Sequence, residues 1–92
     1  MTYIEALTEL AELLPESWDS EFAHLQESGS HVSVVCAMAL IKLMSGVRIE
    51  RQHDGKWAAW DCDGKLFDIG DTITEAVVRL AVKVLRARKE EA

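Results

Sequence analysis

The side chains of this chain that could do chemistry are two cysteines, three histidines and the carboxylates around Asp61-Cys62-Asp63-Gly64. This segment has the glycine of a calcium-binding loop. Placing Gly64 at the sixth position of such a loop puts Ala59 first and Gly70 twelfth, where carboxylates are required. A hairpin turn explains the segment. The spacing therefore predicts no calcium site.

Transition-metal binding and nucleophilic catalysis have no better support. His24, His31 and His53 fall on three different predicted elements, and the chain has no Cys-x-x-Cys or His-x-x-x-His pair. A nucleophile needs an oriented base beside it, whereas Cys36 lies in an apolar segment and Cys62 is predicted to face an aliphatic residue. We expect a protein that is not an enzyme and that uses no cofactor and no metal. An enzyme would need a closed pocket around His53 or Cys62.

Charge is distributed unevenly along the chain. The 92 residues carry a formal net charge of −6; residues 1–30 contain seven acidic and no basic side chains, whereas residues 31–92 contain nine acidic and ten basic ones. Four glutamates recur at helical spacing: Glu5, Glu9, Glu12 and Glu16. Like charges at this spacing repel, and a basic partner would relieve the repulsion; a solvated helix face is the alternative. Because phosphate backbones and anionic membranes repel an acidic chain, we expect a protein partner with a basic surface, no direct nucleic-acid binding and no membrane binding.

Two helices are predicted in the acidic part. A capping box of Thr2 and Glu5 opens the first, which Pro15 ends, and apolar spacing predicts a second over residues 16–27. A third helix, over residues 31–45, is apolar on nearly every side, so other parts of the protein must surround it. Either the first two helices cover it, or a second copy of the chain does. In the second case the expected dimer contacts are Met38, Leu40, Ile41 and Met44.

Three strands follow, joined by turns at Asp54-Gly55 and Asp63-Gly64. With two-residue loops, Ile49 faces Trp60 in the first hairpin and Trp60 faces Phe67 in the second. One face then collects the apolar side chains, with Trp60 and Phe67 at the centre of the core. The members of this face are Val47, Ile49, Ala58, Trp60, Cys62, Phe67 and Ile69.

The opposite face carries Trp57, which should point away from the core. It is either an interface anchor or covered by Trp18 and Phe22. A second capping box, Thr72-Ile73-Thr74-Glu75, opens a last helix that runs to about Lys89. The sequence therefore predicts a single α+β domain over residues 1–92. An acidic helical arm (1–30) precedes an α-β-β-β-α core (31–92), in which helices pack on one face of a three-stranded antiparallel meander.

Two resemblances bear on function. The α-β-β-β-α order resembles the double-stranded-RNA-binding domain, whose last helix begins with lysines that contact phosphates; the matching segment here, Gly70–Glu75, is acidic. Residues 47–86 are similar to small phage and prophage proteins with the ABA-sandwich domain. The matching residues are Gly55-Lys56-Trp57-Ala58-Ala59 and Gly70-Asp71-Thr72, which leads into Glu75-Ala76 and an apolar helix. This resemblance covers under half of the chain and implies an accessory gene of a mobile element, without catalytic residues. Anti-CRISPR proteins are similar in size and charge.

We therefore expect a phage-type inhibitor of host defence that binds a basic, nucleic-acid-handling host protein and occludes its phosphate-binding surface. The expected contact residues are Glu5, Glu9, Glu12, Glu16, Asp19 and Trp57. The alternative is a homodimeric structural or assembly protein of a phage or prophage, with the apolar third helix at its interface. The N-terminus has no basic leader and no apolar run is long enough to cross a bilayer, so we expect a cytoplasmic protein of the bacterial host cell with reduced cysteines.

Overall fold

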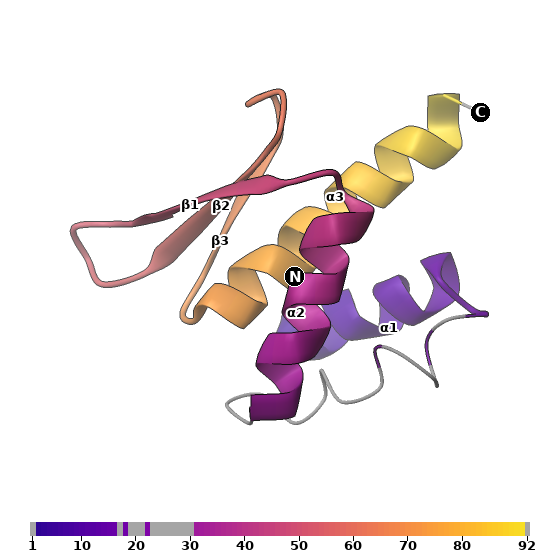
Figure 1. Cartoon of the computed structure of the whole chain (residues 1–92), viewed down its shortest axis with the longest axis horizontal. Helices are drawn as coiled ribbons and strands as arrows, with labels where there is room; N and C mark the ends of the chain where they lie inside the picture. The colour runs from indigo at the N-terminus through magenta and orange to yellow at the C-terminus, as the bar shows by residue number, and fades with distance from the viewer. Residues whose placement is uncertain (1, 17, 19–21, 23–30, 92) are drawn as a thin grey trace.

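Figure 1 shows a computed structural model of the chain, which describes residues 2–16, 18, 22 and 31–91, with the backbone alone at residues 31–34. The elements are α1 (Tyr3–Leu13), α2 (His31–Leu43), β1 (Val47–Arg51), β2 (Trp57–Asp61), β3 (Phe67–Gly70) and α3 (Ile73–Glu91). The strands form one antiparallel sheet in the order β1-β2-β3. This confirms the predicted α+β class and the α-β-β-β-α order. The helix expected over residues 16–27 lies almost wholly outside the described residues.

The helix starts follow from local side chains. The Thr2 hydroxyl accepts the Glu5 amide at 3.2 Å at the start of α1, and the Thr72 hydroxyl accepts the Glu75 amide at 3.1 Å at the start of α3. Each threonine oxygen thereby satisfies a backbone donor that has no partner inside the helix. Both predicted capping threonines are confirmed. At α3 the Glu75 carboxylate also accepts the amide of Asp71, one residue before the cap, at 3.3 Å.

The central helix of the fold is α3, not α2. It packs against β2 and β3 on one side and against α1 and α2 on the other, and Figure 1 shows it crossing the molecule between the sheet and α1. Its valines and alanines are buried around most of its circumference: Ala76, Val77, Val78, Ala81, Val82 and Val84. Within the single chain α2 is not surrounded, because Val35 is 64% and Met38 57% exposed. The expected alternative, that a second copy of the chain covers this helix, stays a prediction.

The first hairpin has a three-residue loop where the sequence predicted a two-residue one. The Gln52 amide donates to the Lys56 carbonyl at 2.7 Å, and the Gly55 amide donates to the Gln52 carbonyl at 3.1 Å. Gly55 has φ +86° and therefore occupies the left-handed third position of such a loop. Ile49 consequently lies opposite Ala59 instead of Trp60. The predicted register of this hairpin is wrong by one residue.

This slip moves the side chains of β1 to the opposite face of β2 and β3, so that Val47 and Ile49 share a face with Trp57 and Ala59. Ala59 is fully buried in the core, and Val47, Ile49, Trp57 and Leu66 pack around it on the helix-covered face. The prediction that Trp57 points away from the core is therefore wrong. The predicted core centre is also wrong, because Trp60 and Phe67 lie on the uncovered face.

The second hairpin has the predicted register, with Trp60 opposite Phe67. Its loop is longer than expected. The Asp61 amide donates to the Leu66 carbonyl at 3.0 Å, and the Asp61 carboxylate accepts the Lys65 amide at 2.8 Å. Beyond it, β3 runs so close to α3 that a Cβ atom on Gly70 would lie 2.5 Å from the Ala76 nitrogen. Glycine at position 70 therefore allows β3 and α3 to touch.

Candidate protein-binding surfaces

The acidic side of α1 is the first candidate surface. The side chains of Glu5, Glu12 and Glu16 are exposed, and no ion pair links any of them to a base in the described part of the chain. Glu9 differs, because it forms an ion pair with Arg86 of α3. Asp19 lies outside the described residues. Three of the predicted contact carboxylates are thus exposed, two on α1 and Glu16 beyond its last residue, and the fourth is tied to the protein itself.

An apolar groove of about 790 Å³ runs along α1, and Glu12 is the glutamate that lines it. Its walls are lined by Tyr3, Ile4, Leu7, Thr8, Ala11, Glu12 and Trp18. At 100° per residue, the groove residues Ile4, Thr8 and Ala11 share one side of α1, and Glu5 and Glu12 follow directly around the helix. Ile4 is 75% exposed. A partner bound in this groove would therefore bury apolar side chains and meet carboxylates at the margin of the contact.

Tyr3 forms the inner wall of the groove. Burial raises the pKa of its hydroxyl to about 12, with smaller contributions from the negative charge of Glu75 and from Cys36. These two neighbours belong to α3 and α2, so Tyr3 lies where the three helices meet. The phenol stays neutral at physiological pH. The charge of this surface therefore comes from the glutamates.

On its other side, α1 borders α3 through a small mixed-charge hollow of about 340 Å³. Glu9 and Glu12 of α1 line it together with Arg86, Lys89 and Glu90 of α3. Arg86 and Lys89 of α3 therefore offset the negative charge on the side of α1 that faces the hollow, and not on the side that faces the groove. Glu12 lines both the hollow and the groove, which places it at the boundary between them.

The residues expected at a helical dimer interface do not form one surface. Leu40 is 0% and Met44 1% exposed, because both belong to the core of the single chain. Ile41 is half-buried against the same core, and only Met38 is freely exposed. The predicted interface is therefore wrong for Leu40 and Met44.

The uncovered face of the sheet is a surface that the sequence reasoning missed. The Trp60 and Phe67 rings stack with their centroids 4.6 Å apart, and the Arg48 guanidinium lies 5.0 Å from the centre of the Trp60 ring. Phe67 is 43% and Ile69 37% exposed. The sequence does contain a signal for this arrangement. Ala59 and Gly70 are small, and small residues mark the face of a sheet that a helix approaches closely, so the larger Trp60 and Phe67 belong to the opposite face.

Of the groups considered for catalysis or metal binding, the side chains of His24 and His31 lie outside the described part of the structure, and the others are dispersed. Cys36 is buried and Cys62 is exposed, and neither forms a disulfide within the described part of the chain. His53 is exposed in the first hairpin loop. Within residues 2–16, 18, 22 and 31–91, no three side chains of His, Cys, Asp or Glu gather into a possible metal site. None of the helices in that part of the chain is long and apolar enough to cross a membrane.

No protein-family model matches this chain, and neither a curated protein nor a solved structure is significantly similar to it.

Proposed function

We propose that this chain is a non-enzymatic binding protein that docks its α1 surface onto a basic segment of a partner protein. The observation that carries the proposal is the groove along α1, which Glu12 lines, together with the exposed carboxylates of Glu5, Glu12 and Glu16. None of the three forms an ion pair within the described part of the chain. Aliphatic and aromatic side chains at the centre of a contact provide burial, and charges at its rim provide steering and specificity.

The partner chemistry follows from this arrangement. A segment with apolar side chains facing Ile4, Leu7 and Trp18 and with lysine or arginine at its margin would complement the groove. Basic segments of this kind also bind phosphates in nucleic-acid-handling proteins. Occupying such a segment would block its phosphate contacts. In the phage context implied by the resemblance, the target would be a host-defence protein.

The test is capture of partners from bacterial lysate, followed by titration of the purified partner, with the full chain as bait. The test variant combines Glu5→Gln, Glu12→Lys and Glu16→Lys. Glutamine is chosen at position 5 because its side-chain oxygen can still accept the hydrogen bond from the Thr2 hydroxyl at the start of α1. The matched control variant changes three exposed acids away from α1 with the same change in charge: Asp63→Lys, Asp71→Asn and Glu91→Lys.

We expect the α1 variant to weaken binding roughly 100-fold or more, because three rim charges act together and two of them become repulsive. The control variant should bind as the original chain does. Raising the salt concentration should weaken binding by the original chain and have less effect on the α1 variant. Equal binding by the original chain and the α1 variant would disprove the proposal.

A further inference from the structure

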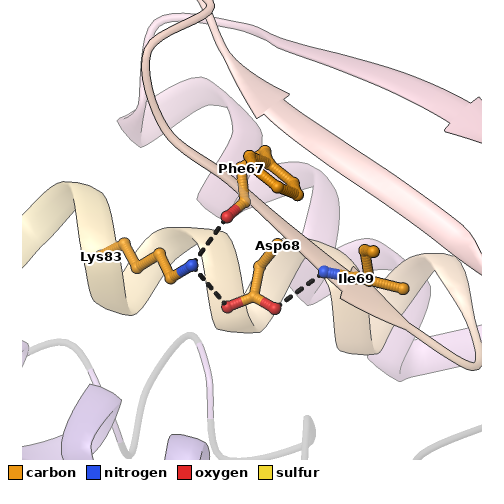
Figure 2. A network of polar contacts seen from close by, with 4 residues as sticks. All are labelled: Phe67, Asp68, Ile69 and Lys83. Atoms are coloured by element: carbon orange, nitrogen blue, oxygen red, sulfur yellow. Dashed lines mark hydrogen bonds and ion pairs between the residues drawn. The ribbon is translucent and has the colours of Figure 1, made fainter.

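The two edges of the sheet differ in how their backbone groups are satisfied. On β3, the Lys83 ammonium donates to the Phe67 carbonyl at 2.8 Å and lies 3.3 Å from the Asp68 carboxylate. The other oxygen of that carboxylate accepts the Ile69 amide at 2.7 Å. Figure 2 shows this network along the strand. Side chains of the protein thus occupy two of the backbone groups that β3 would offer to another strand, the Phe67 carbonyl and the Ile69 amide.

Among the described residues, no side chain covers the outer edge of β1 in this way. The bond from the Gln52 amide to the Lys56 carbonyl fixes the even-numbered residues of β1 as those bonded to β2. The amides and carbonyls of Val47, Ile49 and Arg51 therefore point away from the sheet. In the described part of the chain no side chain hydrogen-bonds to these groups. In Figure 1 the β1–β2 hairpin projects to the left, clear of the three helices.

We propose that two copies of this chain pair β1 with β1 in antiparallel fashion, centred on Ile49, so that their sheets join into one continuous sheet. Ile49 then lies opposite Ile49 of the second copy, and Val47 lies opposite Arg51 of that copy. All of these are residues whose backbone groups point outward, so each pair can exchange two hydrogen bonds. The inference is independent of the α1 surface.

The charges of β1 favour this register. With Ile49 at the centre, Arg48 lies opposite Glu50 of the second copy, and Glu50 opposite its Arg48. These are non-hydrogen-bonded pairs, whose side chains approach most closely, and opposite charges there are stabilising. A shift by two residues in one direction places Arg48 opposite Arg48, and a shift in the other direction places Glu50 opposite Glu50. Both alternatives bring like charges together, so the strand is complementary to itself in one register.

Neighbouring side chains already restrict the Arg48 and Glu50 side chains in the single chain. Arg48 lies 5.0 Å from the centre of the Trp60 ring and 3.7 Å from the Glu50 carboxylate of its own chain. The ring orders the guanidinium, so less side-chain freedom is lost when a second carboxylate approaches. On the other face, Ile49 packs against the core. Pairing it with Ile49 of the second copy would extend the apolar layer across the junction.

The first test measures the mass of the full chain by analytical ultracentrifugation, up to about 1 mM protein and in reducing buffer because Cys62 is exposed. We expect the original chain to dimerise. Arg48→Glu and Glu50→Arg should each weaken dimerisation roughly tenfold or more, because each creates like-charge pairs. Control variants with the same charge changes in the second hairpin loop, Lys65→Glu and Asp63→Arg, should dimerise as the original chain does.

Two rescues separate charge pairing from damage to the fold. The double variant Arg48→Glu/Glu50→Arg restores opposite charges in the same register and should regain dimerisation. An equimolar mixture of the Arg48→Glu and Glu50→Arg chains should form a mixed dimer, because every pair across the junction is again complementary. Circular dichroism of each variant confirms folding. Failure of both rescues in folded chains would overturn the proposal.

Amide hydrogen exchange locates the interface. As the concentration rises, the amides of Val47, Ile49 and Arg51 should exchange more slowly, whereas the Ile69 amide should not change, because it is already hydrogen-bonded. A chain that remains monomeric throughout would overturn the proposal. A dimer that Met38→Glu dissociates and Arg48→Glu does not would also overturn it and place the contact on α2.

Discussion

The outer strands of one small sheet, β1 and β3, are held in the molecule in different ways. β3 packs against α3, approaches it closely at Gly70 and has its outer groups bonded by Lys83 and Asp68. β1 has extensive contacts with β2 alone. An exposed strand edge is a template for another strand, and proteins cover the edges that must stay free. The contrast indicates that the edge of β3 is protected by side chains of the same chain, whereas the edge of β1 can pair with a strand of another molecule.

A pair of prolines in β1 gives the largest expected effect. The Glu50 amide points into the sheet, so Glu50→Pro should lower the free energy of unfolding by about 3 kcal/mol. The Arg51 amide points outward, so the matched variant Arg51→Pro should cost less than about 1 kcal/mol. Urea denaturation followed by tryptophan fluorescence measures both. Equal losses would show that β1 has no open edge.

Gly70→Ala tests the close approach of β3 to α3. The added Cβ would lie 2.5 Å from the Ala76 nitrogen and 2.9 Å from the Glu75 carbonyl carbon, so the backbone itself must move. We expect a loss of about 2 kcal/mol in the free energy of unfolding. The comparison variant is Gly55→Ala in the β1–β2 loop, where no atom lies within 4 Å and only the positive φ is unfavourable. It should cost about 1 kcal/mol. The order would be reversed if β3 were as loosely attached as β1.

The packing of α1 against the other two helices should weaken in alkaline solution. The pKa of Tyr3 is raised from 10.0 to about 12 in the fold, so between these values the unfolded chain loses a proton that the folded chain keeps. Stability from this group is present below pH 10.0 and is lost as the pH rises towards about 12. Because Tyr3 is partly exposed, we expect a loss of about 1 kcal/mol. Denaturation of the original chain and of Tyr3→Phe over this range measures it; the same pH slope in both would contradict the assignment.

Features that depend on neighbouring residues were predictable from the sequence. The capping threonines, the element order and the register of the second hairpin all follow from residues within a few positions of one another. The first hairpin was not predictable in this way, because an Asp-Gly pair fits both a two-residue and a three-residue loop. Only the packing of Ala59 against the helices decides between them.

In the candidate surfaces, too, features set by neighbouring residues were predictable and features set by distant contacts were not. The exposed glutamates of α1 were predictable from their spacing, whereas the partner of Glu9 was not, since Arg86 lies 77 residues further along the chain. Leu40 and Met44 face the core because α2 packs against α3, a contact that their own apolar segment does not specify. The open edge of β1 became visible only once the hairpin register was known.

Removing the cover of β3 should make its edge resemble that of β1. Lys83→Met keeps most of the aliphatic side chain and removes the donor to the Phe67 carbonyl and the ion pair with Asp68. Because the pair is partly exposed, the expected loss in the free energy of unfolding is small, about 0.5 kcal/mol. The more informative readout is association, since a second open edge should make the variant form species larger than a dimer in light scattering. The control Lys89→Met changes an exposed lysine of the same helix and should behave as the original chain does. If both variants have the same mass, Lys83 stabilises β3 without protecting its edge.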